Sequence, residues 1–398
     1  MTAFPADPIA AVTHPDPYPY YAALAEHKPL YHDMTLGLWV ASSAEAVTAV
    51  LTSDLCRVRP PTEPVPVALR RSPAGDIFRH MVRFNDGESH CPFKEAVSAA
   101  LGAITVTGAA ERSAACALSL SDEIAPTRDP GHLSRFAFHL PIYVAASLLG
   151  IPDDLLPQVA VWAGDFAHCL APGSGPAQIA RGTVAAGNLL AMFDALAPTL
   201  RDESANTLLA LLAREARRVG RDDADVIVAN GIGFLFQAYD ATAGLIGNVL
   251  LALASHPDVH ARLVADRGLL PQMIEEVLRY DPPVQNTRRF VADDGEIAGQ
   301  AMHEGEEILV ILAAAGRDPS ANPRPERFDI FREDPRISTF GAGVHTCPGA
   351  SLATTIARAG IAQLLASGAD PERLAKPVTY RPSQNVRIAL APMEGTYA

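Results

Sequence analysis

Charged residues and aromatic residues are both scarce in this chain of 398 residues. Only 19% of the residues are charged and 6% are aromatic, whereas 48% are hydrophobic. The formal net charge is -13 and no basic stripe runs along the sequence, which argues against nucleic acid or an anionic membrane surface as a partner. The apolar fraction suffices for a sizeable core. Because no stretch resembles a linker, we expect one domain over residues 1–398.

Cysteine is also scarce, and its spacing is irregular. The five cysteines are Cys56, Cys91, Cys116, Cys169 and Cys347. Their intervals fit neither a disulfide framework nor a set of zinc ligands, which favours a reducing compartment. The N-terminus has prolines and acidic residues where a signal peptide has a basic end and an apolar run. We therefore expect a cytoplasmic, monomeric protein without a targeting segment.

Helical periodicity dominates the chain. Apolar residues recur with helical spacing over most of residues 88–269, with breaks at Gly or Pro. Residues 57–84 contain enough proline for a mostly irregular excursion, with little regular structure before Arg70. Short strand signals lie at 286–293, 296–303 and 306–314. The sequence therefore predicts a mainly helical fold with small sheets toward the C-terminal half.

The segment over residues 224–257 is the longest apolar one, with apolar groups on nearly every helical face. Asn230, Gln237, Asp240 and Asn248 interrupt it, and no second span follows. We therefore expect a helix through the protein core rather than a membrane span. Polar residues in the middle of such a helix indicate a function.

Residues 339–353 read TFGAGVHTCPGASLA, a glycine-rich loop before an apolar helical stretch. Backbone N–H groups of such a loop and the N-terminus of the following helix favour negative charge on the sulfur of Cys347. A single thiolate without further Cys or His at metal-ligand spacing cannot form a zinc site, whereas an axial haem ligand needs only one protein atom. This asymmetry favours haem.

The loop resembles that of the cytochrome P-450 superfamily, written F-G-x-G-x-H-x-C-x-G. The matching residues are Phe340, Gly341, Gly343, His345, Cys347 and Gly349. The resemblance implies that haem b lies between the long central helix and this loop, with Cys347 as the iron ligand and His345 at a propionate. It also implies a small β-containing lobe formed by parts of 1–70 and 283–312, with a helical lobe from most of the rest. The alternative is a tight turn around a structural cysteine.

Two further segments occur in the order that the family implies. Glu276 and Arg279 match its E-x-x-R pair and lie on one helix face, and Arg327 is expected to complete a buried Glu-Arg-Arg clamp that supports the loop. An isolated pair of this kind would otherwise be a surface ion pair.

The family's helix over one haem edge resembles NDGESHCPFKEAV, which offers His90 and Lys94 as propionate ligands. Lysine stands where arginine is usual, which keeps the charge but loses the bidentate fork. The resemblance also offers Arg289, in preference to Arg288, as an expected further propionate ligand. A histidine at a helix start could otherwise be a surface or capping residue.

The distal motif departs from the family pattern A-G-x-D/E-T-T. The acid is kept as Asp240, but Ala241 replaces the alcohol that assists proton delivery, and Thr242 follows about 100° further round the helix. Ala238 and Ala241 share a face with Gln237 that is expected to look onto the haem. We predict that Asp240 with Gln237, Thr242, water or substrate handles protons. Alternatively, Gln237 only satisfies a buried carbonyl.

The resemblance implies reductive activation of dioxygen at a thiolate-ligated haem and oxidation of a small organic substrate. Because no flavin or iron–sulfur domain is recognised, electrons are expected from a ferredoxin and an NAD(P)H-dependent ferredoxin reductase. Residues 60–84 should help to line the pocket. The other expected pocket residues are Phe234, Gln237, Val284, Gln285, Asn286, Ser383, Gln384 and Asn385. Their polarity favours a polar natural product. A haem-thiolate ligand-binding protein and a peroxide-driven oxygenase are the alternatives.

Overall fold

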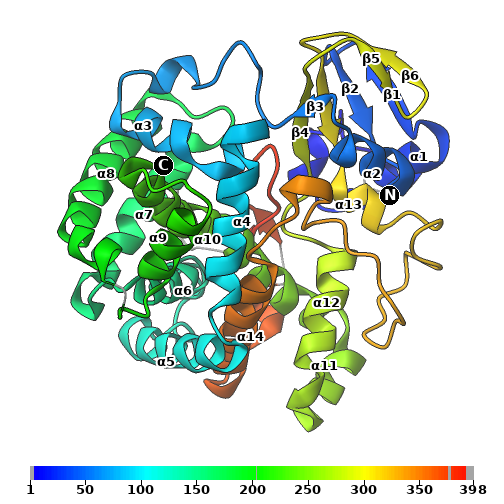
Figure 1. The fold of residues 1–398 in the computed structure, drawn as a ribbon. Helices are drawn as coiled ribbons and strands as arrows, with labels where there is room; N and C mark the ends of the chain where they lie inside the picture. The colour runs from blue at the N-terminus through cyan, green and yellow to red at the C-terminus, as the bar shows by residue number, and fades with distance from the viewer. Residues whose placement is uncertain (1–3, 203, 375–377, 391–398) are drawn as a thin grey trace.

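Helices form most of the protein, and a small sheet lies to one side of them. A computed structural model describes residues 4–202, 204–374 and 378–390. Figure 1 shows the five-stranded sheet with α1 and α2 at the upper right and most of the helices at the left and below. The helices, in chain order, are α1 (Tyr18–His27), α2 (Ala44–Thr52), α3 (Pro73–His80), α4 (Cys91–Gly102), α5 (Val106–Ile124), α6 (Pro130–Leu149), α7 (Leu156–Leu170), α8 (Pro176–Ala195), α9 (Leu208–Arg218), α10 (Ala224–Ser255), α11 (Pro257–Ala265), α12 (Leu270–Tyr280), α13 (Leu312–Gly316) and α14 (Ala350–Ala366).

The five-stranded sheet joins two distant parts of the sequence. Its spatial order is β1 (Leu30–Asp33), β2 (Leu38–Ala41), β7 (Glu307–Val310), β4 (Thr287–Val291) and β3 (Cys56–Arg57). β2 and β7 pair in parallel, and the other neighbours are antiparallel. Two hairpin-like pairs complete the strands, β5 (Gly295–Ile297) with β6 (Gln300–Met302) and β8 (Thr379–Tyr380) with β9 (Ala389–Leu390). The division of the chain into two lobes stays a prediction.

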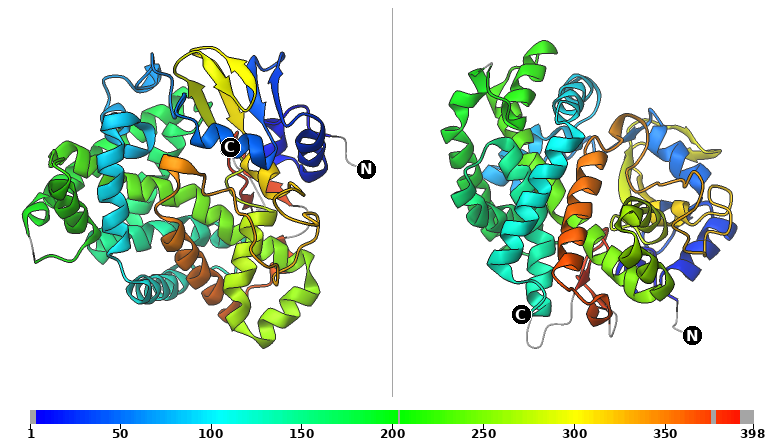
Figure 2. Two further views of the ribbon diagram at one scale, coloured as in Figure 1. Left: turned by 45° about the vertical axis from the view of Figure 1, so that its right-hand side comes forward. Right: turned by 90° about the horizontal axis from the view of Figure 1, so that it is seen from below.

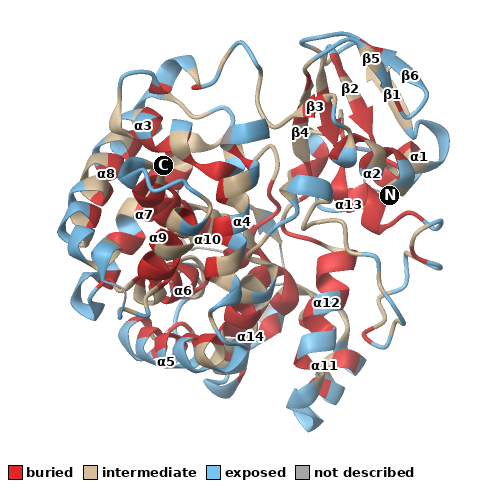
Figure 3. Cartoon of the chain, viewed as in Figure 1, coloured by how far each residue is buried: buried red, intermediate tan, exposed pale blue. Residues whose placement is uncertain are grey.

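α10 runs through the helical core and packs against α6 and α14. It is long and apolar enough to cross a membrane, but 72% of its most apolar window is buried within the protein, as expected of a core helix. The Asp223 carboxylate caps its first turn by accepting from the N–H groups of Asp225 and Val226. Figure 2 shows α14 between α5 and α12 in its right-hand view, and Figure 3 shows exposed residues on the outer faces of α5 and α8.

The polar residues at the two ends of α10 hold neighbouring backbone. Asn230 donates to His80 O at 2.9 Å and accepts from Val82 N at 2.8 Å. Asn248 donates to Asp281 O at 2.9 Å. These amides satisfy backbone groups that the core would otherwise leave without a partner. Gln237 and Asp240 lie in the middle of the helix, where the candidate site begins.

In two segments the observed secondary structure can be compared closely with the one expected from the sequence. Residues 57–84 form short 3-10 turns and, from Pro73 onward, α3, which agrees with little regular structure before Arg70. The strand expected over 306–314 ends at Val310, because Leu312–Gly316 forms α13. The sequence LAAAG of this helix is rich in alanine, the strongest helix former.

Candidate active site

The Cys347 loop is shaped by hydrogen bonds and by two left-handed glycines. Cys347 N donates to Phe340 O at 2.9 Å, and the thiol is exposed. Gly341 and Gly343 have φ of +72° and +68°, a conformation that glycine adopts without steric cost. A Cβ on Gly343 would also lie 3.0 Å from Leu51 O. The loop therefore presents one thiol just before the N-terminus of α14.

The middle of α10 is open on one face. Phe234, Gln237, Ala238 and Ala241 are each partly exposed, and their spacing puts them on the same side of the helix. The residues on either side of this stretch, 227–233 and 242–250, are buried throughout. The rest of the protein therefore covers this side of the core helix incompletely, and we call the face formed by these four residues the distal face.

The three candidate proton-handling residues differ in their surroundings. Gln237 Nε2 donates to Gly233 O at 3.0 Å, so its amide nitrogen satisfies a helix carbonyl, as in the alternative interpretation from the sequence. Thr242 is 2% exposed, off the distal face. Asp240 Oδ2 accepts from Arg381 Nη2 at 2.6 Å. The buried Asp240 Oδ1 has no hydrogen-bond partner among the described residues.

Sequence reasoning missed Arg381, which lies 141 positions after Asp240 and has no motif of its own. Its Nη1 lies 3.3 Å from His168 Nε2 on α7, and its guanidinium lies 5.3 Å from the centroid of the Phe138 ring. Burial, and then the charge of Arg381, lower the pKa of His168. A neutral His168 can accept a hydrogen bond from Arg381, so this trio of Asp240, Arg381 and His168 forms one connected network.

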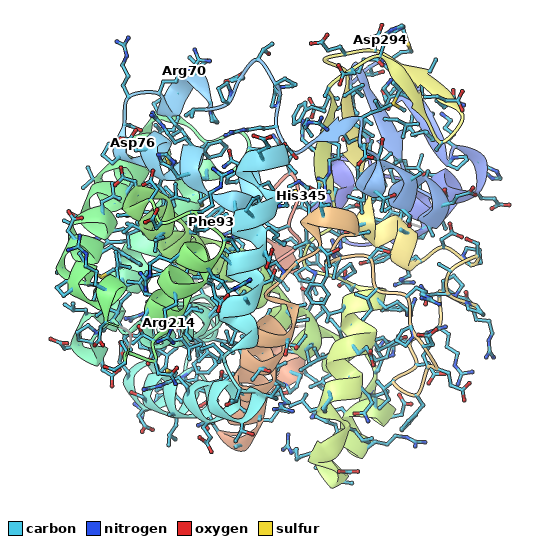
Figure 4. All side chains as sticks on the ribbon, in the orientation of Figure 1. Arg70, Asp76, Phe93, Arg214, Asp294 and His345 are labelled. Carbon is cyan, nitrogen blue, oxygen red and sulfur yellow. The ribbon has the colours of Figure 1, made fainter. Side chains whose placement is uncertain are left out.

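A second group of residues gathers near the Cys347 loop. The rings of His90 and His345 lie 4.1 Å apart, and His345 Nε2 lies 2.9 Å from Asp86 Oδ1. Figure 4 places His345 between the helical part and the sheet. Burial, and then the nearby His345 and Lys94, lower the pKa of His90 to about 4. Burial alone would raise the pKa of Asp86, but hydrogen bonds from His345 and Val58 N–H lower it.

The other two expected propionate ligands, Lys94 and Arg289, are cations without a carboxylate partner among the described residues. Lys94 Nζ donates to Thr346 O at 2.6 Å, and burial lowers its pKa. Arg289 is buried on β4, where its pKa is likewise lowered by burial. Within the described part of the chain it pairs with no acid, whereas Arg288 pairs with Glu307. Between the two arginines, Arg289 is therefore the one whose charge is unpaired.

These residues fit a haem better than a bare metal ion. No cluster of three His, Cys, Asp or Glu side chains suited to a metal occurs among the residues described. The site instead offers one thiol, several poorly solvated cations and His90 Nδ1, which is buried without a partner within the same described residues. A haem can be held by a single protein atom on its iron and carries two propionate carboxylates, so its chemistry matches this set of donors.

The expected Glu-Arg-Arg clamp contains a different second arginine from the one predicted. Arg279 and Glu276 are 0% and 2% exposed and form two hydrogen bonds of 2.7 and 2.8 Å. The side chain of Arg327 is 57% exposed and pairs with Asp329, and only its carbonyl accepts from Arg279. Arg332, which is 11% exposed, lies 3.5 Å from Glu276 instead. The prediction of Arg327 was therefore wrong, because residues 327–332 turn its side chain outward.

Several of the expected polar pocket residues form hydrogen bonds with backbone groups, which the sequence did not reveal. Gln285 is fully buried and donates to Pro282 O at 2.7 Å, and Asn286 donates to Gln384 O at 2.9 Å. The Asn286 amide thus ties the C-terminal turn to the segment after α12, whereas the Gln285 amide nitrogen bonds its own segment, so both nitrogens are used by the backbone. The Ser383 hydroxyl accepts from Val386 N at 3.1 Å within its own turn. Among the expected polar residues, Gln237, Ser383, Gln384 and Asn385 are partly exposed, whereas Gln285 and Asn286 are buried.

Comparisons with known proteins identify the family of this fold. The cytochrome P-450 family model matches residues 194–367. The chain is 30% identical to 6-deoxyerythronolide B hydroxylase of Saccharopolyspora erythraea, with 85% of each chain covered. It is also 30% identical to the monooxygenase PikC of Streptomyces venezuelae, with 88% of this chain and 83% of the relative covered. The chain belongs to the cytochrome P-450 family and is an oxidoreductase that incorporates oxygen.

Solved structures agree with this assignment. The crystal structure of CalO2 superposes with a TM-score of 0.80 at 27% identity and covers 98% of both chains. A cytochrome P-450 in complex with hexadec-9Z-enoic acid ligated acyl carrier protein gives a TM-score of 0.80 at 25% identity, with 94% of this chain and 97% of that chain covered. The mainly helical fold with small sheets, predicted from the sequence, is confirmed.

Proposed function

We propose that this chain is a monooxygenase in which Cys347 ligates the iron of haem b and the distal face of α10 borders the substrate. The observation that carries the proposal is the exposed thiol of a constrained loop in a protein whose central helix opens in its middle. His90, Lys94, Arg289 and His345 would hold the propionates, because they are cationic or hydrogen-bonding groups near the same loop.

When bound, the haem supplies dioxygen activation and insertion of oxygen into the substrate. The side chains of the protein would orient the substrate and deliver protons to the site. Arg381 holds one oxygen of Asp240 and leaves Oδ1 able to accept a proton or a water at the middle of α10. Gln237 can contribute its carbonyl oxygen as an acceptor, since its nitrogen is already bonded. Buried Thr242 is left out of this proton path.

The substrate is a small organic molecule, and we favour a natural product with some polar groups. The named activity of one relative, 6-deoxyerythronolide B hydroxylase, supports this class. Gln285 and Asn286 do not support a polar substrate as the sequence suggested, because their amide nitrogens donate to backbone carbonyls. Electrons would come from a ferredoxin and its NAD(P)H-dependent reductase in the cytoplasm. The exposed Val344 beside Cys347 gives such a partner an apolar contact.

The first test is the absorption spectrum of the reduced protein with carbon monoxide. Wild type should give the red-shifted Soret band of a thiolate ligand, and Cys347→Ala should lose it. Cys91→Ala is a matched control, because Cys91 is also exposed but starts α4. A wild-type protein that binds no haem, or a Cys347→Ala variant with an unchanged spectrum, would refute the assignment.

One observation favours a second function. Ala241 stands on the distal face where the family has an alcohol, so a ligand-binding protein without efficient turnover is the competing proposal. NAD(P)H consumption with product formation beside surrogate redox partners would support the monooxygenase. Haem with the thiolate signature but no product, across a substrate panel, would support the ligand-binding protein. Product formed from peroxide without a reductase would indicate a peroxide-driven oxygenase.

A further inference from the structure

The backbone that carries Arg381 is fixed by the last strand pair of the described chain. Arg381 N donates to Ile388 O at 3.0 Å, directly after the pairing of β8 with β9. The other arm of this turn carries Arg387, which is 2% exposed and donates to Asp281 Oδ1 at 3.0 Å. Its guanidinium also donates to the carbonyls of Val12, His14 and Pro15. The position of the Arg381 guanidinium therefore depends on the partners of its own side chain.

The Arg381 guanidinium bridges two helices. Nη2 donates to Asp240 Oδ2 on α10 at 2.6 Å, and Nη1 lies 3.3 Å from His168 Nε2 on α7. The side chains of Arg381 and Asp240 are 17% and 24% exposed, so solvent screens this pair only in part. A side chain that is held at two points has fewer arrangements than one held at a single point. His168 therefore restricts the directions from which Arg381 can approach Asp240.

His168 is itself held in place. Its carbonyl accepts from Ser174 Oγ at 2.5 Å near the end of α7, and its ring meets the Tyr239 ring edge-on at 5.9 Å. A neutral imidazole has one nitrogen that accepts a hydrogen bond, whereas both nitrogens of an imidazolium are donors. A protonated His168 can therefore accept nothing from Arg381, and its positive charge repels the guanidinium. The state of this histidine determines whether Arg381 has one anchor or two.

The charges around His168 come from three helices and the C-terminal turn. Burial lowers its pKa most, Arg381 lowers it further, and Asp240 on α10 opposes this shift. Asp165 on α7 and Arg181 on α8 have smaller effects of opposite sign, and they lie 3.5 Å apart. α6 contributes the ring of Phe138, which is uncharged and lies beside the Arg381 guanidinium. Among these charges, Arg381 and Asp240 are therefore the main partners of His168.

We infer that His168 is a positioning residue for the oxygenase reaction. By accepting from Arg381, it keeps Arg381 on Oδ2 of Asp240 and leaves the buried Oδ1 for protons. Protonation of His168 removes this acceptor and releases Arg381 from its second anchor. The inference rests on the proposed function, in which Asp240 handles the protons of the reaction, and it assigns control of that group to a residue of α7.

The first test measures the network without turnover. Isotope-labelled histidine allows the pKa of His168 to be followed by NMR titration of the haem-loaded protein in its diamagnetic, carbon monoxide-bound form. Arg381→Gln removes a cation and should raise the pKa of His168 by about 0.5 or more. Asp240→Asn removes an anion and should lower it by a similar amount. Exposed His132 is the internal control and should not shift in either variant. An unchanged pKa of His168 in both variants would overturn the network.

The second test measures the reaction with a probe that needs neither the native substrate nor a redox partner. Hydrogen peroxide is the oxidant and guaiacol the reductant. Two guaiacol molecules each give up one electron and one proton, and the peroxide becomes two water molecules. This conversion requires a proton to move between the two peroxide oxygens, which is the task assigned to Asp240. Rates are compared between about pH 5 and 8, so that the range includes the ordinary histidine pKa of about 6.5.

The variants at position 168 should separate positioning from titration. His168→Gln offers an amide oxygen that accepts from Arg381 at every pH, so it should match wild type above about pH 7 and slow less as the pH falls. His168→Leu offers no acceptor and should be about three- to tenfold slower even above that pH. His132→Gln is the control and should follow wild type throughout. A purely structural role of His168 would change the rate without changing its pH dependence.

The carbon monoxide spectrum of each variant distinguishes the possible failures. A wild type without the thiolate signature would refute the proposed function, and the role of His168 in the reaction with it. With a normal spectrum, the same pH dependence in wild type and His168→Gln would overturn only the inference about His168. A wild-type rate in His168→Leu would do the same. A wild type with the thiolate signature that oxidises no guaiacol would also contradict it, because Asp240 would then move no peroxide proton.

Discussion

The two sides of the expected haem site are built differently. On the Cys347 side, the loop is shaped by a backbone hydrogen bond and two left-handed glycines, and the buried pair of Glu276 and Arg279 holds backbone groups of residues 316–329 that precede it. On the α10 side, the central residues have few partners. Among the described residues, Asp240 keeps a buried oxygen without a hydrogen-bond partner, and the Gln237 amide nitrogen donates to a carbonyl of its own helix.

The difference matches two different tasks, because the Cys347 loop would hold the same ligand for every substrate whereas the α10 side would adapt to the substrate. A ligand loop must hold one sulfur in place for any substrate, so many interactions determine its geometry. A substrate side must leave polar groups available for molecules that come and go, which costs stability in the empty protein. Substitutions on the two sides should therefore have different kinds of effect.

The largest effect is expected from Arg279→Ala in the clamp. The change leaves the carboxylate of Glu276 buried without its bidentate partner, which should lower the free energy of unfolding by about 3 to 5 kcal/mol. Denaturant unfolding of the haem-loaded protein measures this loss. Arg279→Lys, which keeps the charge but not the fork, should lie between wild type and Arg279→Ala. A loss below about 1 kcal/mol would mean that the loop does not depend on the clamp.

Asp240→Asn should affect turnover rather than folding. Without an ionisable group at the middle of α10, product formation should slow by roughly 100-fold, with haem content and the carbon monoxide spectrum unchanged. Thr242→Val is the control, and it should change the rate less than about twofold because Thr242 is buried off the distal face. Rates of product formation with surrogate redox partners decide the matter. An equal loss in the two variants would restore Thr242 as a proton-handling residue.

The two candidate second arginines of the clamp should behave differently. Arg332→Leu removes a nearly buried cation from Glu276 and should lower the free energy of unfolding by about 1 to 3 kcal/mol. Arg327→Leu changes a surface side chain and should stay within about 0.5 kcal/mol of wild type. Unfolding curves of both variants measure this contrast. The reverse order would show that the clamp uses Arg327 after all.

The smallest effect concerns pH and His168. Burial and Arg381 lower its pKa in the folded state, so the unfolded chain binds more protons as the pH falls below about 6.5. The stability that neutral His168 contributes is thus present above that pH and lost as the pH falls through its folded pKa. Unfolding curves of His168→Gln should depend less on pH in this range, whereas exposed His132→Gln should follow wild type. A wild-type slope in His168→Gln would contradict the network.

The sequence identified the residues whose roles depend on a short motif. The Cys347 loop, the Glu276–Arg279 pair and the long core helix could be found because neighbours in sequence determine their geometry. It failed for Arg327, since a motif that ends in an irregular stretch does not say which way a side chain turns. It also counted Gln285 and Asn286 as pocket residues, although their backbone partners become visible only in the folded chain.

The sequence by itself determined the family, the thiol that would bind iron and the missing alcohol at Ala241, because each depends on residue type at fixed spacing. The tertiary structure decided which charges are paired. Arg381 reaches Asp240 across 141 positions, and Arg332 replaces Arg327 at Glu276. Such pairings depend on which distant segments fold side by side, and local spacing carries no information about them.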